Sequence, residues 1–275
     1  MNSSGRGALI VVAGQAGKLG IQFAGLVILS RLLDPRDFGL IAMVAVFVGL
    51  GDLLRDFGVP TAALSARSLP PQLASNLFWV NTALGGLAAV LLVSLTPLVV
   101  WLYNEPDLAV ILPVMAIAPA LNGLQAQLQV YLARRSRFGA IAATDVVAQM
   151  AGLGVACGLA LLGAEYWALV AQVVVSAGIL LVLRALSARW RPLRFRRGVG
   201  SRAIVLSGGE FGAAQVLTYF ASQVDSLTLG VFFGPYVSGL YSRAFQLAGV
   251  PINGVLAPLT QVVVPHVNRA RSETV

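Results

Sequence analysis

Charged residues are scarce in this chain. Its 19 basic and 11 acidic side chains make up 11% of 275 residues, whereas hydrophobic residues make up 57%. An ordinary globular domain carries about 25% charged residues. A water-soluble fold of this length needs polar surface that so few charges do not supply, whereas helices that face hydrocarbon need none. The mean hydropathy of +0.82 agrees, so the composition excludes a soluble protein, a disordered chain and a coiled coil.

Cysteine and histidine each occur once, as Cys157 and His266. Cys157 lies inside an apolar run, so we expect neither a disulfide framework nor a metal site built on cysteine or histidine. No nucleophile lies near His266 in the sequence, which disfavours a Ser-His-Asp arrangement. Around Lys18, Leu19 replaces the Ser or Thr, and Val12 the first Gly, of a nucleotide-binding P-loop. We therefore expect a protein that is not an enzyme and that has no metal, cofactor or ATP site.

Long apolar runs are abundant instead. A run of about 17 residues or more, at roughly 1.5 Å per residue, is suited to crossing a hydrocarbon core of roughly 30 Å. Such runs predict an all-α fold, a polytopic transmembrane bundle of about eight helices. They occupy residues 8–30, 38–54, 77–103, 108–132, 140–162, 166–186, 203–233 and 236–265. The first run is not expected to be a cleaved signal peptide, because it carries Lys18 and continues past any plausible cleavage site.

Basic residues predict the orientation, because Lys and Arg in short loops stay on the cytoplasmic side. With both termini inside, fifteen basic residues fall in inner segments: Arg6, Arg55, Arg67, Arg134, Arg135, Arg137, Arg184, Arg189, Arg191, Arg194, Arg196, Arg197, Arg202, Arg269 and Arg271. Arg31 and Arg36 are outside, and Lys18 and Arg243 lie within the membrane. The outer loops carry acids instead: Asp34, Asp37, Glu105, Asp107 and Glu165. We predict a multi-pass protein of the inner (cytoplasmic) membrane with cytoplasmic termini. Because the arginines lie in loops between apolar runs, the net charge of +8 does not indicate nucleic-acid binding.

The longest inner connection divides the predicted helices into six and two. We expect a first six-helix lobe at 1–186, an arginine-rich cytoplasmic loop at 187–202, and the first two helices of an incomplete second lobe at 203–275. The loop arginines suit a lipid headgroup or a partner, but a solvated loop held against anionic membrane lipids explains them as well. No internal repeat is obvious, although a weak six-helix repeat could begin after Arg202.

Polar side chains recur at membrane depth, where ionisable groups are costly and are candidates for function. Gln15, Lys18 and Gln22 share one face of the first helix because of their spacing. Further stripes occur in three other runs: Asn122, Gln125 and Gln129; Asp145 and Gln149; Thr218, Ser222 and Asp225. Such stripes predict a shared hydrated cavity with six substrate-binding residues: Gln15, Lys18, Gln22, Gln125, Gln149 and Arg243. The competing interpretation is that the amides join helices without lining a cavity.

Asp225 and Arg243 are predicted to lie at matching depth in the hairpin of the last two runs, about 10 to 12 Å below its outer end. We expect them to pair. Either Arg243 binds an anion while Asp225 positions it, or two buried charges neutralise each other. Glu210, near the inner end of the seventh run, is either a proton site or a side chain that reaches the interface. Asp145, Glu210 and Asp225 are thus the candidates for ion coupling or charge pairing.

Two blocks of sequence resemble a known family. Residues 30–43, Ser-Arg-Leu-Leu-Asp-Pro-Arg-Asp-Phe-Gly-Leu-Ile-Ala-Met, followed by Asp-Phe-Gly-Val-Pro at 56–60, are similar to the first outer loop and second helix of Wzx-type flippases. These proteins transport lipid-linked oligosaccharides for polysaccharide synthesis. Residues 233–247, Phe-Gly-Pro-Tyr-Val-Ser-Gly-Leu-Tyr-Ser-Arg-Ala-Phe-Gln-Leu, resemble the seventh and eighth helices of the same family.

The resemblance implies the multidrug/oligosaccharidyl-lipid/polysaccharide exporter fold, with two six-helix lobes around a central cationic cavity. It also implies a polyprenyl-diphosphate-linked oligosaccharide as the substrate, flipped outward by alternating access. Eight helices supply only part of that fold. The chain is then a fragment, a split transporter completed by a second chain, or an inactive remnant with a scaffolding role. Two further functions are compatible with the sequence: a cation-coupled exporter of small molecules with the same fold, and a membrane glycosyl- or acyltransferase.

Overall fold

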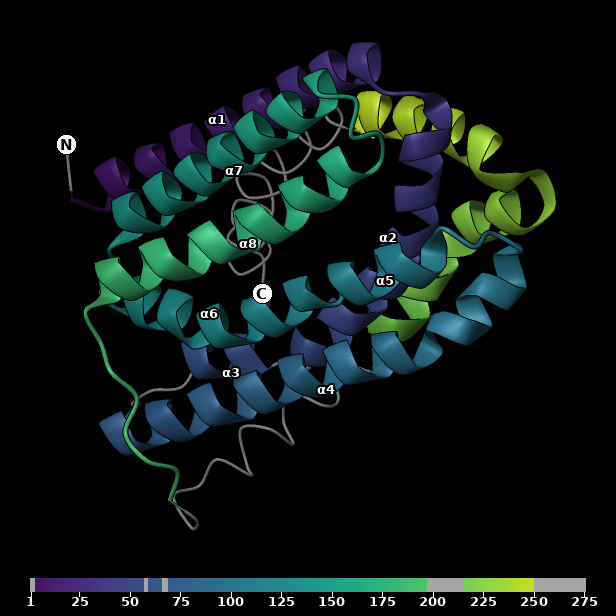
Figure 1. The fold of residues 1–275 in the computed structure, drawn as a ribbon. Coiled ribbons are helices and arrows are strands. Elements are labelled where there is room, and N and C mark those ends of the chain that lie inside the picture. Colours follow the sequence, from purple (N-terminus) through teal and green to yellow (C-terminus); the bar gives the residue numbers. More distant parts are fainter. Residues whose placement is uncertain (1–2, 57–58, 66–68, 197–214, 250–275) are drawn as a thin grey trace, which may run out of the picture.

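The structure is a bundle of long helices (Figure 1). It is a computed structural model, and it describes residues 3–56, 59–65, 69–196 and 215–249. The helices are α1 (Ser3–Leu32), α2 (Pro35–Asp56), α3 (Val59–Ser65), α4 (Pro71–Tyr103), α5 (Leu108–Met115), α6 (Ile117–Arg134), α7 (Phe138–Leu161) and α8 (Trp167–Ala188). A further helical segment, Gln215–Gly249, follows. The predicted all-α transmembrane bundle is confirmed.

Six of the described segments are long and apolar enough to cross a membrane: Pro35–Asp56, Pro71–Tyr103, Leu108–Arg134, Phe138–Leu161, Trp167–Ala188 and Gln215–Gly249. The run expected at 108–132 is divided into α5 and α6. Pro113 and Pro119 lie on either side of the break at Ala116, and neither has an amide hydrogen for the helical ladder. The short helix α3 is an element that the apolar runs did not predict.

The segment Gln215–Gly249, called the hairpin from here on, folds back on itself (Figure 1). Gly234, at φ +75°, occupies the turn. The hydroxyl of Tyr241 donates a hydrogen bond to the carboxylate of Asp225. In one straight helix these residues would be about 24 Å apart, so this contact requires the turn. The two arms match the last two predicted runs within 215–249, and the remainder of those runs lies outside the described residues.

The helix connections divide between two ends of the bundle. The corners α1–α2, α4–α5 and α7–α8 and the turn at Gly234 lie at one end, called the Asn104 end after the first residue of the α4–α5 loop. Arg36 links two of these corners through ion pairs of 3.2 Å to Glu105 and 3.0 Å to Asp107. The opposite end, called the Arg194 end, carries α3 and the segment that follows α8.

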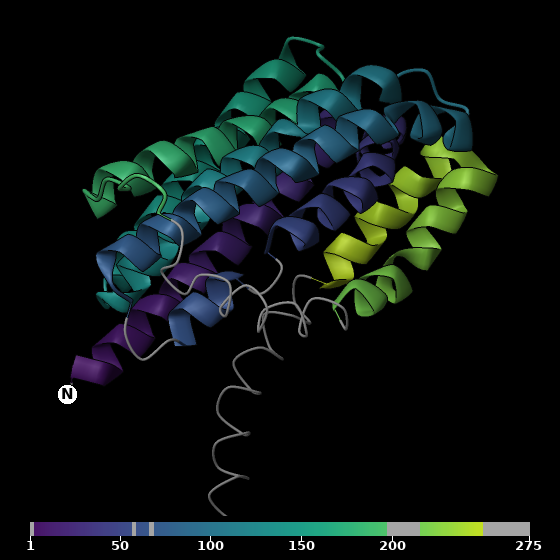
Figure 2. The same cartoon turned by 90° about the horizontal axis from the view of Figure 1, so that it is seen from below.

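Close helix packing depends on glycine at the α4–α6 and α1–α7 contacts. A Cβ at Gly85 would lie 2.8 Å from the carbonyl oxygen of Pro119, and one at Gly123 would lie 2.6 Å from that of Asn81. A Cβ at Gly14 of α1 would lie 2.6 Å from the Cβ of Ala142 of α7, and α1 runs beside α7 in both views (Figures 1 and 2). Small residues let helices approach in membranes, where association depends on packing rather than on the hydrophobic effect.

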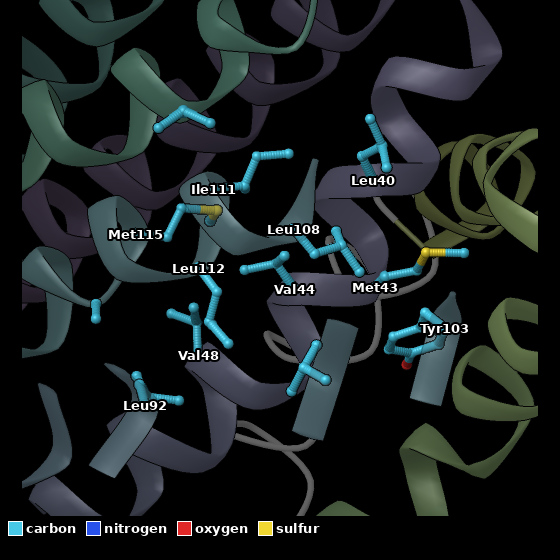
Figure 3. Close-up of a cluster of buried hydrophobic side chains, with 13 residues drawn as sticks. Leu40, Met43, Val44, Val48, Leu92, Tyr103, Leu108, Ile111, Leu112 and Met115 are labelled. Atoms are coloured by element: carbon cyan, nitrogen blue, oxygen red, sulfur yellow. The ribbon is translucent and has the colours of Figure 1, made fainter. Parts of the chain in front are cut away.

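The largest buried apolar cluster lies between α2, α4 and α5, toward the Asn104 end (Figure 3). Leu40 and Val44 of α2 face Leu108 and Leu112 of α5, and all four are fully buried. Tyr103, the last residue of α4, packs edge-on against Phe47 with ring centroids 6.2 Å apart. This cluster fixes α2 against the rest of the bundle, and the opposite face of α2 lines the cavity described next.

Candidate functional site

A cavity of about 470 Å³ lies between α1, α2, α6, α7, α8 and the hairpin. Three charged side chains line it: Lys18, Asp52 and Asp145. Its uncharged polar lining consists of five amides and two hydroxyls: Gln22, Asn122, Gln149, Gln172, Gln246, Ser176 and Ser242. The remaining wall is mostly aliphatic. A cavity of this composition offers many hydrogen-bonding groups and few charges.

The structure brings several predicted site residues together. Lys18, Gln22, Asp145 and Gln149 all line the cavity, from α1 and α7. Gln125 is not part of the lining. It is buried within the bundle and donates a 2.8 Å hydrogen bond to Asn122, which does line the cavity.

Two predicted site residues are not placed by the structure. Gln15 belongs to α1, but its side chain lies outside the described residues. Glu210 also lies outside the described residues. Neither residue is used in the arguments that follow.

Arg184 is a functional candidate that the sequence did not identify. Its position near the end of an apolar run places it among the inner basic residues, whereas the structure shows that its side chain lies inside the bundle rather than at a loop surface. The side chain is 4% exposed and forms a 2.7 Å ion pair with Asp145. It also donates hydrogen bonds to the amide oxygens of Gln125 and Gln129. The polar stripes of α6 and α7 were a usable signal, because amides and a carboxylate facing inward indicate a cationic partner.

A continuous chain of polar contacts crosses four helices. It begins at Arg55, which pairs with Asp52 at 3.5 Å on α2. Asn122 of α6 donates to Asp52 at 3.3 Å and accepts from Gln125. Gln125 in turn accepts from Arg184 of α8, which holds Asp145 of α7. Such a network satisfies buried groups that would each be costly alone.

This network determines the charge of the cavity. Asp145 is compensated by Arg184, whereas Asp52 shares Arg55 with Asp56, which lies nearer to the guanidinium at 2.7 Å. Lys18, in the middle of the 30-residue helix α1, has no carboxylate within ion-pair distance among the described residues. Lys18 is therefore a lining cation with no ion-pair partner among the described residues, beside neutral amides.

The ion pair expected between Asp225 and Arg243 is not formed. Asp225 accepts hydrogen bonds from the Tyr241 hydroxyl and the Ser226 amide. Arg243 instead donates to the carbonyl of Leu33 at 2.8 Å and lies over the ring of Phe38, 4.0 Å from its centroid. The guanidinium turns toward the α1–α2 corner, where a helix-terminal carbonyl lacks an intrahelical partner.

Residues 28–275 match a family model described as polysaccharide biosynthesis protein. The lipopolysaccharide biosynthesis protein WzxC of Escherichia coli is 24% identical over 262 residues, covering 93% of this chain and 52% of that protein. The succinoglycan biosynthesis transport protein ExoT of Rhizobium meliloti is 27% identical, covering 92% and 51%.

The teichuronic acid biosynthesis protein TuaB of Bacillus subtilis is 21% identical, covering 89% of this chain and 50% of that protein. The chain thus spans about half the length of these relatives. No solved structure matches it significantly.

Proposed function

This chain belongs to the polysaccharide biosynthesis protein family, and on that premise we propose that it serves to move a polyprenyl-diphosphate-linked oligosaccharide across the cytoplasmic membrane. The observation that carries the proposal is the cavity, with its uncompensated Lys18 among amides. A diphosphate is anionic and suits the ammonium group, sugar hydroxyls suit the amides, and the lipid tail can remain in the bilayer.

The other half of the relatives' length is expected to complete the cavity. We propose that a second set of helices, in the same polypeptide or in a second chain, closes the side along the hairpin. The hairpin supports this proposal because it is poorly buried, although it carries polar residues at membrane depth such as Ser222 and Asp225.

A cation-coupled exporter of small molecules is less well supported by the geometry. Such a transporter needs an acidic residue that is available to an ion. Of the two cavity carboxylates, Asp145 is held by Arg184, and Asp52 accepts from Asn122 and shares Arg55 with Asp56. Asp225, the third predicted coupling residue, does not line the cavity and is bonded to Tyr241.

We propose the cytoplasmic membrane as the location, with the Arg194 end in the cytoplasm. Residues 189–196, which follow α8, contain four arginines and no acid. Side chains of α4 hold this segment by hydrogen bonds from Gln72 and Trp79 to the carbonyls of Arg194 and Leu193. Arginines at this interface suit anionic lipid headgroups, and the exposed Leu193 and Phe195 suit the adjacent acyl chains.

The proposed function is tested in the native host by deleting the gene. We expect surface polysaccharide to be lost and the lipid-linked oligosaccharide to accumulate on the cytoplasmic side. Complementation with the unmodified gene or with Lys18→Arg should restore export. Lys18→Met should reduce export by about tenfold or more, because a charged hydrogen bond to the diphosphate is lost.

Arg191→Met serves as the matched control, because it removes a cation from the exposed segment rather than from the cavity. Membrane abundance of every variant is measured by immunoblot. Equal export by Lys18→Met and Lys18→Arg at equal abundance would exclude a cavity role for the charge. Unchanged surface polysaccharide after deletion would exclude the proposed function.

A further inference from the structure

The two corners at the Asn104 end share a short sequence pattern. Helix α2 begins with Pro35-Arg-Asp-Phe-Gly39-Leu40, and the second arm of the hairpin begins with Pro235-Tyr-Val-Ser-Gly239-Leu240. Pro, Gly and Leu recur at the same spacing, and their numbers differ by 200 in each case. Proline suits the first turn of a helix because it has no amide hydrogen to leave unpaired there. The pattern therefore starts a helix in both places and sets a glycine one turn later.

These two helix starts contact each other reciprocally. A Cβ at Gly39 would overlap the carbonyl of Pro235, and a Cβ at Gly239 would overlap the carbonyl of Pro35. Each glycine thus lies against the proline of the other segment, as in a two-fold symmetric interface. The backbones touch directly, so no space for a ligand remains between α2 and the hairpin at this level.

The cavity lies next to this contact, with a lining that runs from Phe38 to Asp52 on α2 and includes Ser242 and Gln246 on the hairpin. Ala42 of α2 and Ser242 of the hairpin line the cavity, and each lies three residues after its glycine. The cavity lining continues from there to Lys18 and Asp52. The contact therefore lies across the end of the cavity that faces the Asn104 end.

Arg243 adds a second link between the hairpin and the α1–α2 corner, next to the glycine contact. Its hydrogen bond to Leu33 and its position over Phe38 connect the hairpin to the last carbonyls of α1 and the first turn of α2. Phe38 also lines the cavity. The first arm of the hairpin also packs on α2, where the Tyr219 hydroxyl donates to the carbonyl of Val46 at 2.6 Å. Separation of α2 from the hairpin therefore breaks this bond as well as the contacts of Arg243.

We propose that Pro35, Gly39, Pro235 and Gly239 form the gate at the Asn104 end of the cavity, and that Arg243 is its latch. The structure is the closed state of this gate. A cargo leaves toward the Asn104 end only when α2 and the hairpin separate at the two glycines and Arg243 releases Leu33. The inference rests on the proposed function only for the identity of the cargo.

The test measures access to the cavity. Ser242→Cys is introduced together with Cys157→Ser in the full chain in membranes, and an impermeant methanethiosulfonate reagent is applied. The reagent is added on the side from which Asn104→Cys, a cysteine in the loop above the gate, is labelled. We expect Ser242→Cys to be labelled much more slowly than Asn104→Cys. Combining it with Gly39→Ala and Gly239→Ala should accelerate its labelling by about tenfold, because the added methyl groups hold the gate apart.

Gly86→Ala is the matched control, since a Cβ there meets open space, and it should leave the labelling rate unchanged. Arg243→Gln adds no bulk, and it should accelerate labelling as well; it provides the deciding measurement if the double alanine variant is not recovered in membranes. The gate is excluded if Ser242→Cys is labelled as fast as Asn104→Cys, or if Arg243→Gln leaves the rate unchanged. Cysteine labelling does not require the cargo. If the labelling rates follow this pattern but the export experiments exclude the proposed function, the gate stands and only the identity of the cargo is refuted.

Discussion

Arg184 of α8 and Asp145 of α7 form a 2.7 Å ion pair in the interior of the bundle. The pair links the cavity, which Asp145 lines, to the amides of α6 that also contact Arg184. A buried charge left without its partner is strongly destabilising, whereas removing both charges costs much less. The pair is thus expected to stabilise the arrangement of α6, α7 and α8 around the cavity.

Removing one member of this pair should destabilise the fold. Arg184→Gln should lower the free energy of unfolding by about 3 to 5 kcal/mol, because Asp145 is left uncompensated. The double variant with Asp145→Asn should recover most of the loss. The loss in the single variant and the recovery in the double variant are measured by thermal unfolding of the purified protein, with size-exclusion chromatography used to monitor the folded fraction. The exposed Arg191→Gln should change stability by no more than about 0.5 kcal/mol, and a double variant with the summed loss of both single variants would contradict the pairing.

The orientation of the chain predicts which loops react from outside the cell. In a Cys157→Ser background, Asn104→Cys should react with an impermeant maleimide added to intact cells. Arg194→Cys should react only after the cells are permeabilised, because basic segments remain in the cytoplasm. Mass-tagging and gel electrophoresis quantify the labelling. The reverse labelling pattern would show that the bundle is inserted in the opposite membrane orientation.

Asn76 is expected to hold the segment 189–196 on α4. Its fully buried amide donates to the carbonyl of Arg196 at 2.6 Å and accepts from the amide of Arg196 at 3.0 Å. Asn76→Ala removes both bonds, so trypsin should cut at the arginines of the segment about tenfold faster in the detergent-solubilised protein. Thr82→Ala removes only a hydrogen bond within α4 and serves as the control. An unchanged cleavage rate for Asn76→Ala would mean that other contacts hold the segment.

Gly85 and Gly86 are neighbours on α4, and their substitution by alanine is expected to have opposite effects on stability. A Cβ at Gly85 meets the backbone of α6, whereas a Cβ at Gly86 meets open space. Gly85→Ala should destabilise the protein by about 1 to 3 kcal/mol, because α4 and α6 must separate. Gly86→Ala should be neutral or stabilising by up to about 1 kcal/mol, since alanine favours a helix. The melting temperatures of the two variants give the comparison, and similar values would contradict the close packing of α4 on α6.

The position of Lys18 in the cavity was predictable from its surroundings in the sequence. A cation in the middle of an apolar run, with amides at helical spacing, has no low-cost place in hydrocarbon and turns toward a hydrated interior. Asp145 and Gln149 were predictable for the same reason. The lining residue Gln172 is uncharged and is the only amide in its run, and a lone amide fits a helix contact equally well.

The sequence by itself determined that this is an all-helical membrane protein and where most of its helices lie. This is because apolar length and the cost of an unpaired backbone in lipid leave no other fold for such runs. Only the tertiary structure decided which polar groups meet. Arg184 lies four residues before the end of its helix, and its sequence position is as consistent with a membrane surface as with the interior. Arg243 likewise reaches Leu33, 210 residues away, instead of Asp225. Sequence spacing fixes the depth of a side chain in the membrane, but the neighbour it faces depends on how helices rotate and pack, and here glycine contacts between distant segments set that packing.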